Sequence, residues 1–419
     1  MPSPQARYNR GVRDAVSEVI RYNRAFDRES LRRKVEAMSR GPFEFFRATS
    51  HLFALDVRFG RSEPAGLIIG DLHSENFGAF RAVSNDIVYD INDFDDCATG
   101  AYEYDLRRLL TSLVVGGEAA KLPLSGCVAA CEAALDEYVA AIARFGKCTH
   151  RRDLAARKSA AQVKGLLAVA RERSRVDMLR GFVTQDRQTG RWLFRANPKF
   201  APLDGARRAA IAEAFPHFLR HCQAPAGAET SKYVLEDAVF RFAGRGSLGR
   251  ERYALLLRKG LAAREDLTAL RLIEWKAAFD SPLDSTHPHT RAQGKGRAKA
   301  IYDAALRFQM QPKRYWGFTV VNSRPFQVRE IGANDDRFSP KKFSNAARLS
   351  VAARVFGGIT ARAHLMSSLG TEGPRPLAKA KASMQRPLIA FALGYAEIVQ
   401  RDQADFCQRA DEVREALKL

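Results

Sequence analysis

Strand-type patterning is concentrated in one central block of the chain, and this distribution most constrains the fold. Residues 233–331 contain short strand-like runs such as "YVLEDAVFRFAG" and "RYALLLRKG", with one helical stretch at 297–310. The flanking regions have mostly helical periodicity, which predicts an α+β fold rather than alternating βαβ units. A chain of 419 residues is long enough for several units. We expect a mostly helical lobe at 1–232, a strand-rich lobe at 233–335, and C-terminal helices at 336–419 that pack on the helical lobe.

Two apolar runs in the predicted helical lobe are each followed by a group of polar residues. These are "GLIIGDLHSENFGAF" (66–80) and "IVYDINDFDD" (87–96), which we read as two short strands with their loops. Phosphoryl transfer needs a carboxylate that orients the attacking hydroxyl, and amide and carboxylate oxygens that hold magnesium. Asp71 and Asn76 have a spacing that lets one tight loop present both, and Asp93 follows the second strand. The alternative is that the two aspartates only cap turns.

The strand-rich block contains a glycine pattern in "FAGRGSLGRERYALLL". Gly244, Gly246 and Gly249, with Ser247 between them, match a GxGxxG loop. A dinucleotide-binding version would open a helix after its last glycine, but the sequence continues as a strand. A glycine loop between antiparallel strands is typical of kinases, which carry a phosphate-binding lysine on the next strand. Lys276 has that position in "LRLIEWKAAF", where an edge lysine without such a role is the alternative.

Composition excludes several classes of protein. The six cysteines form no CxxC pair, the N-terminus lacks the apolar segment of a signal peptide, and no run is long enough to span a bilayer. We therefore expect a cytoplasmic protein without a membrane partner. The formal charge of +21 attracts polyanions in principle, but the basic residues are spread over the predicted helices. We do not expect nucleic-acid binding, and an acidic partner is left open.

The motifs together resemble a known class of enzymes. "GDLHSENFGAF" followed by "NDFDDCATGAYEYDLRRL" is similar to the catalytic and metal loops of aminoglycoside and choline kinase-like phosphotransferases, including a later aspartate, Asp105, that buttresses the site. Most of the chain resembles the bacterial family called domain of unknown function 2252, on the stretches "RRKVEAMSRGPFEFFRATSHLF", "ARVFGGITARAHLM" and "YAEIVQRDQADF".

The resemblance implies a role for each motif. Asp71 would be the catalytic base, and Asn76 and Asp93 would be the magnesium ligands, with Asp90 a competitor of Asp93. Lys276 and the glycine loop would hold the phosphates of ATP. The strand "PFQVREI" would lead into the segment that contacts adenine, around Glu330, Ile331 and Gly332.

Two departures from the kinase pattern are visible. The catalytic and metal loops precede the glycine loop, so the resemblance implies a two-lobed, circularly permuted kinase-like fold. The helix expected to supply a glutamate to the strand lysine offers only Asp303.

These features predict an ATP- and magnesium-dependent phosphotransferase that acts on a hydroxyl-bearing small molecule or protein. Two alternatives stay open. One is an enzyme of the same fold that transfers AMP from an ATP bound in reversed orientation, and the other is a non-catalytic ATP-sensing or basic interaction module.

Overall fold

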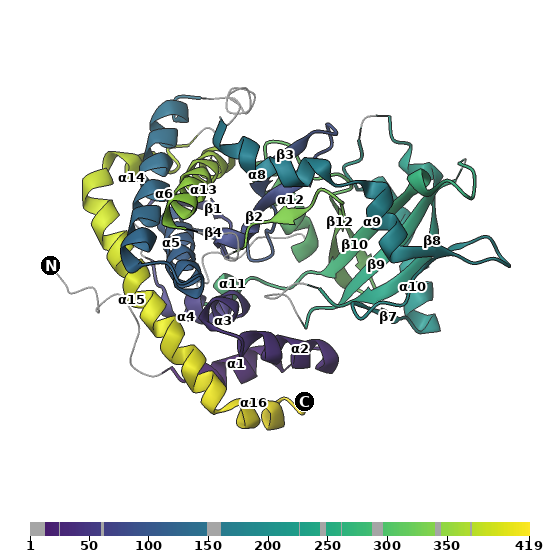
Figure 1. Ribbon diagram of the computed structural model, residues 1–419, viewed down its shortest axis with the longest axis horizontal. Helices are drawn as coiled ribbons and strands as arrows, with labels where there is room; N and C mark the ends of the chain where they lie inside the picture. Colours follow the sequence, from purple (N-terminus) through teal and green to yellow (C-terminus); the bar gives the residue numbers. More distant parts are fainter. Residues whose placement is uncertain are drawn as a thin grey trace.

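The computed structural model describes residues 13–24, 26–59, 63–148, 161–225, 227–243, 249–260, 262–286, 296–339, 345–368 and 371–419. Figure 1 shows a helical part and a strand-rich part side by side, so the protein has the α+β architecture expected from its sequence. Among the described residues, none of the helices combines the length and the apolar character needed to cross a membrane.

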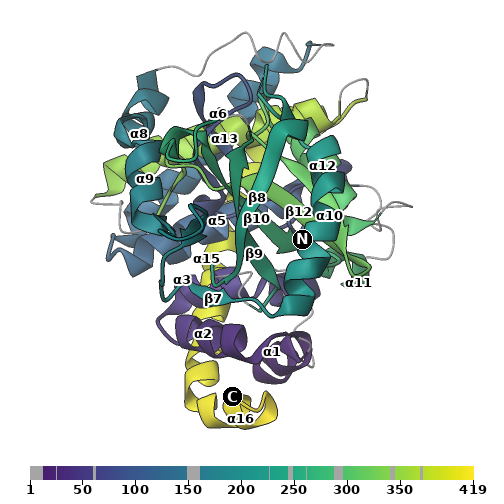
Figure 2. The ribbon, with the colours of Figure 1, turned by 90° about the vertical axis from the view of Figure 1, so that its right-hand side faces the viewer.

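The strand-rich part is built on one antiparallel sheet of six strands in the order β11-β12-β10-β9-β8-β7. The strands are β7 (Phe200–Pro202), β8 (Tyr233–Arg241), β9 (Arg252–Lys259), β10 (Leu270–Ala277), β11 (Gly317–Val321) and β12 (Arg324–Glu330). Helix α10 (Gly205–Arg220) packs on one face, beside the sheet in Figure 2. The sequence predicts that the strand-rich part begins at residue 233. Strand β7 and helix α10 come before that residue in the chain, but they pack with the strands of this sheet. Helix α12 (Arg297–Phe308) follows β10 and contacts β11 and β12.

The two faces of this sheet differ in polarity because successive side chains of a strand point to opposite sides. Ile273 and Trp275 of β10 are buried in the apolar cluster formed with Phe215 and Phe218 of α10. Glu274 and Lys276 alternate with them and are also buried, so they lie on the other face. That face directs charged groups toward the helical part.

The helical part is organised around four helices. They are α5 (Tyr102–Ala119), α6 (Leu124–Phe145), α13 (Ala346–Ser367) and α15 (Lys381–Gln408). The closest approach is between α6 and α13, where a Cβ atom at Gly357 would lie 1.9 Å from the carbonyl oxygen of Ala134. Only glycine fits this crossing. Helix α15 runs along the outside of the part and contacts α5, as Figure 1 shows in yellow.

Short helices and strands complete the helical part. The N-terminal helices are α1 (Ala15–Asn23), α2 (Arg28–Met38), α3 (Pro42–Ala48) and α4 (Ser50–Asp56), and the C-terminal ones are α14 (Arg375–Lys379) and α16 (Ala410–Ala416). Four short strands, rather than the two expected, lie between residues 65 and 101: β1 (Ala65–Ile68), β2 (Phe77–Arg81), β3 (Ile87–Ile91) and β4 (Ala98–Ala101). β1 pairs with β4, and β2 lies between β3 and β13 (Asp336–Arg337). This additional pairing folds the two polar loops back on each other.

The remaining elements connect the two parts. Helices α8 (Ala161–Glu172) and α9 (Arg175–Phe182) lead to a hairpin of β5 (Val183–Gln185) and β6 (Trp192–Phe194). The sequence "TQDRQTGRWLFRANPKF" predicts an exposed hairpin at its Gln-Thr-Gly centre, and the structure confirms the hairpin. Helix α11 (Pro282–Thr286) follows β10 and contacts α4.

Candidate active site

The loop that carries Asp71 is held by a buried carboxylate from the next long helix. Asp105, in the first turn of α5, accepts hydrogen bonds from the backbone N–H groups of Ile69 and Gly70, both at 2.8 Å. Its Oδ2 atom also lies 3.1 Å from Nε2 of His364 on α13. Gly70 has a φ of +83°, and a Cβ there would lie 2.1 Å from the carbonyl oxygen of Asp96. The sharp turn after β1 therefore requires glycine, and it brings the Asp71 loop against the second polar loop.

Loss of this support gives a first prediction. Asp105→Asn is expected to lower the free energy of unfolding by about 3 kcal/mol, because it replaces an ionised acceptor of several buried hydrogen bonds with a neutral amide. Urea denaturation measures the change. Asp177→Asn, at an exposed position of α9, is the control and should change stability by no more than about 0.5 kcal/mol. A loss below about 1 kcal/mol in Asp105→Asn would contradict the supporting role.

Asp71 lines a small cavity, described below, and its carboxylate lies beside Arg108 and His73. Nε of Arg108 donates a 2.8 Å hydrogen bond to Oδ1 of Asp71, and Nε2 of His73 lies 3.8 Å from Oδ2. Burial raises the pKa of Asp71 to about 7, even though the nearby Arg108 favours the ionised form. Such a carboxyl group is suited to accept a proton near neutral pH.

Asn76 and Asp93 are brought next to Asp71 by the pairing of β2 with β3. Asn76 ends a 3-10 turn (Ser74–Asn76), and its Nδ2 donates a 2.5 Å hydrogen bond to the backbone oxygen of Asp71. The backbone N–H of Asn92 donates to the carbonyl oxygen of Asn76 at 2.9 Å. Asp93 is the next residue, and its Oδ1 is a buried atom without a hydrogen-bond partner among the described residues. An anionic oxygen left without a donor is a suitable ligand for a hard cation.

Lys276 reaches this second polar loop from the opposite part of the molecule. It lies on β10, between β9 and β12, and is only 1% exposed, so it is not an edge lysine. Its Nζ lies 3.7 Å from Oδ1 of Asp93 and forms an ion pair with Asp95. Burial lowers the pKa of Lys276, while Asp93 and Asp95 oppose that shift. Asp303 forms an ion pair with Lys299 on its own helix at 2.5 Å, so the carboxylates recorded beside Lys276 come from the loop after β3.

Asp90, the competitor of Asp93, has structural contacts. Its side chain pairs with Arg362 of α13 at 2.5 Å and accepts from the backbone N–H groups of Ile91 and Met310. These contacts tie β3 to the helical part, and Asp90 is not among the residues that line the cavity.

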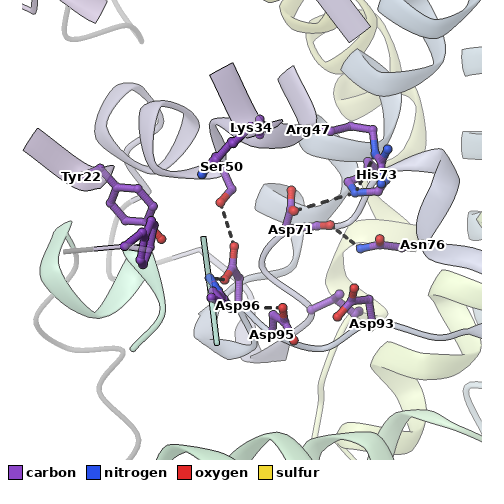
Figure 3. A pocket seen from close by; sticks show the side chains of 14 residues that line it. Tyr22, Lys34, Arg47, Ser50, Asp71, His73, Asn76, Asp93, Asp95 and Asp96 are labelled. Carbon is purple, nitrogen blue, oxygen red and sulfur yellow. Dashed lines mark hydrogen bonds and ion pairs between the residues drawn. The ribbon is translucent and has the colours of Figure 1, made fainter. Parts of the chain in front are cut away.

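The cavity formed by these loops is small and polar, and Figure 3 shows most of its lining side chains. Its volume is about 40 Å³, which corresponds to room for about three water molecules. Asp71, Asn76 and Asp93 all line it. Sequence reasoning gave no catalytic, metal-binding or nucleotide-binding role to the other lining residues: Tyr22, Phe26, Lys34, Arg47, Ala48, Ser50, Ile69, His73, Asp95, Asp96 and Arg250. Asp95 and Asp96 belong to the same group of carboxylates in the sequence, whereas nothing in the spacing of Lys34 or Arg47 relates them to Asp71.

A second cavity of about 340 Å³ lies next to the first, on the charged side of the sheet. It is lined by Glu330, Ile331 and Gly332, the predicted adenine segment, and by Asn92, the neighbour of Asp93. The carboxylate of Glu330 is held by Arg314 at 2.6 and 2.8 Å, and the N–H of Ile331 donates to the carbonyl oxygen of Leu272. The backbone N–H groups of Glu330 and Gly332 also donate within the protein, to the carbonyl oxygen of Arg314 and to Oδ2 of Asp335. The segment therefore contributes a wall of the cavity with its N–H groups already bonded.

Three arginines from three different strands also line the second cavity. Arg241, Arg252 and Arg329 each pair with the buried carboxylate of Glu274, at distances of up to 2.8 Å. They hold the pKa of Glu274 well below its usual range, against the effect of burial. The excess of positive charge over this single glutamate suits an anionic ligand.

The predicted glycine loop is only partly described. Gly244, Gly246 and Ser247 lie outside the described residues. Gly249 has a φ of +98° and packs on Phe26, so that a Cβ there would lie 2.8 Å from the ring. The loop connects β8 and β9, which pair antiparallel, and a strand rather than a helix follows it.

The donor set around Asp93 fits magnesium. Magnesium is commonly bound by one or two carboxylates together with substrate phosphates. Asn76 and Asp93 line the same cavity, and the neighbouring Asp95 is already paired with Lys276 and Arg250. No group of three or more potential metal ligands of the His, Cys, Asp or Glu type occurs within the described residues. An ion held by Asn76 and Asp93 would complete its coordination with water and with oxygens of a substrate.

The fold and the site define an α+β protein in which a helical unit and a six-stranded sheet meet at one acidic cavity. The chain belongs to the family described as "Uncharacterized protein conserved in bacteria (DUF2252)", which matches residues 24–409. Neither a curated protein nor a solved structure matches this sequence.

Proposed function

We propose that the protein is an ATP- and magnesium-dependent phosphotransferase with a circularly permuted kinase-like fold. One observation carries this proposal. Asp71, Asn76 and Asp93 line a single cavity, and Lys276, far along the chain, reaches to 3.7 Å from the carboxylate of Asp93. Turn-capping aspartates and a packing lysine have no reason to converge in this way.

The order of elements in the strand-rich part supports the kinase-like arrangement. Two antiparallel strands, β8 and β9, flank the glycine segment, Lys276 lies on the following strand, and helix α12 comes after the short helix α11. Kinases use this order of glycine loop, strand lysine and helix to hold the phosphates of ATP. Because the Asp71 and Asp93 loops come earlier in the chain, the order of the two lobes is reversed.

The geometry suggests a division of roles. Asp71 orients the acceptor hydroxyl and accepts its proton as the acceptor oxygen bonds to the γ-phosphorus and ADP leaves. Asp93 and Asn76 hold magnesium, which supplies charge neutralisation on the phosphates. Lys276 exchanges its ion pair with Asp95 for a contact with the phosphates. The base lies in the second cavity, against the backbone of residues 330–332.

The three arginines of the second cavity favour one further candidate. Positive charge where the base is expected to lie suits phosphates instead. An ATP molecule bound in the reversed orientation would place its terminal phosphates near Arg241, Arg252 and Arg329 and its α-phosphorus near Asp71. The same residues would then transfer AMP. A purely ATP-sensing module is less well supported, because it has no need of a carboxyl group with the raised pKa of Asp71.

A binding measurement tests the nucleotide site. Saturating ATP with magnesium is expected to raise the melting temperature by several degrees, since a ligand at 100 times its dissociation constant stabilises the native state by about 2.7 kcal/mol. Lys276→Met should lose most of this shift. Lys379→Met, at an exposed position of α14, is the control and should keep it. No shift with ATP, ADP or GTP in the unmodified protein would contradict nucleotide binding.

Isotopic labelling separates the two transfers. ATP labelled at the γ position should label the acceptor fraction of a metabolite or protein extract if phosphoryl transfer is correct. Label that arrives only from the α position would replace the proposal with AMP transfer.

A further inference from the structure

Lys34 is a buried amine in the wall of the catalytic cavity. It projects from α2, is 2% exposed and lines the cavity together with Asp71. Its Nζ donates one hydrogen bond, to Oδ1 of Asn23 at 2.8 Å. The rings of Phe26 and Tyr22 lie 5.5 and 5.7 Å away. Within the ranges that the structure describes, Lys34 has no ion pair with a carboxylate, so two of its three donors have no recorded oxygen partner.

The surroundings of Lys34 favour an anionic partner. Burial lowers the pKa of Lys34 to about 7, and the positive charge of Arg250 on the same cavity adds to that effect, while the charge of Asp96 opposes it. An anion bound between two cations would offset the cost of burying them. The carboxylates of Asp95 and Asp96 are already paired with Arg250, and Asp95 also with Lys276.

The N-terminal helices restrict what can reach Asp71. Tyr22 of α1, Lys34 of α2, Arg47 of α3 and Ser50 of α4 all line the cavity, and Figure 3 shows Lys34, Arg47 and Ser50 along the side opposite Asp93, Asp95 and Asp96. Phe26 extends this cover to the strand-rich part through edge contact with Phe279 at 5.5 Å. A space of about 40 Å³ beneath four helices has room for one small group of an acceptor but not for an extended polypeptide.

We propose that the acceptor is a small hydroxyl-bearing anion whose carboxylate or phosphate group is bound by Lys34. This inference rests on the proposed transferase function. In this arrangement Lys34 determines specificity by holding the charged end of the acceptor, while its hydroxyl faces Asp71. The covering helices disfavour a protein acceptor.

The test uses the full chain with magnesium and ADP, and four pools of small hydroxyl compounds: hydroxy acids, phosphorylated polyols, neutral sugars and amino sugars. We expect only an anionic pool to raise the melting temperature further, and the first two pools distinguish a carboxylate from a phosphate. Lys34→Met should weaken binding of the active compound by about tenfold or more, the usual range for a hydrogen bond to a charged group. The shift caused by ATP and magnesium should stay unchanged in this variant.

Two further variants keep the result interpretable. Lys34→Arg retains the charge and should keep part of the affinity, whereas Lys379→Met should behave as the unmodified protein. The inference would be wrong if neutral or amino sugars raised the melting temperature, or if no anionic pool did. It would also be wrong if Lys34→Met bound the anion as tightly as the unmodified protein, or if serine-containing peptides became labelled. If ATP with magnesium did not raise the melting temperature of the unmodified protein, the result would instead count against the transferase function.

Discussion

Replacing Asp71 with asparagine is expected to lower the rate of transfer by about 10²- to 10⁴-fold, the usual contribution of general-base catalysis. The ATP-induced rise in melting temperature should remain nearly intact, because Asp71 acts on the acceptor and mainly in the transition state. The amide can still accept the hydrogen bond from Arg108, which is recorded at 2.8 Å. Single-turnover transfer of labelled phosphate measures the rate.

We expect the protein to fold without the charge of Asp71. Its raised pKa means that folding favours the protonated carboxyl group, and this stabilisation is present at low pH and lost as the pH rises through about 7. A neutral asparagine should therefore leave the unliganded protein folded at pH 8. Asp303→Asn is the matched control and should turn over normally, since the carboxylate of Asp303 is partly exposed and its ion pair recorded among the described residues is with Lys299. Normal turnover in Asp71→Asn would remove Asp71 from catalysis.

Asp93→Asn should act differently, with loss of both binding and turnover. Hard cations favour anionic oxygen ligands, so an amide at this position weakens magnesium already in the bound state. We expect the dissociation constant of ATP to rise by about tenfold or more when magnesium is present and to change little in its absence, because a charge-assisted contact of this kind is typically worth about 1.5–3 kcal/mol. Calorimetric titration of ATP with and without magnesium measures the difference.

Asp90→Asn provides the comparison for this experiment. Asp90 pairs with Arg362 and accepts from backbone N–H groups, so its replacement should lower stability and leave the magnesium dependence of ATP binding unchanged. If Asp90→Asn and Asp93→Asn affected magnesium equally, the assignment of the metal ligand to Asp93 would be wrong. Equal loss of nucleotide binding in Asp71→Asn and Asp93→Asn would show instead that both aspartates only hold the fold.

Local sequence patterns predicted the parts of the site that depend on short-range geometry. The α+β class, the hairpin around Thr189 and the strand that follows Gly249 could be read from periodicity and turn residues. The spacing of Asp71 and Asn76 also predicted a shared loop, and the structure places the Asn76 side chain on the backbone of Asp71. These features involve residues a few positions apart, where chain geometry leaves few arrangements.

The tertiary structure alone decided which distant residues meet. Lys276 lies beside Asp93 and Asp95, rather than beside a carboxylate from α12, because β10 is central in the sheet and its polar face is turned toward the loop after β3. The N-terminal helices cover Asp71 and bring Lys34 into the cavity, which no spacing in the sequence indicated.

The sequence by itself thus determined the residue types and the local loops of this site. Their assembly, and the choice among several neighbouring carboxylates, depended on packing between segments far apart in the chain. Such contacts are set by which faces of helices and strands bury one another. Periodicity identifies that a face is buried, but not against which partner it packs.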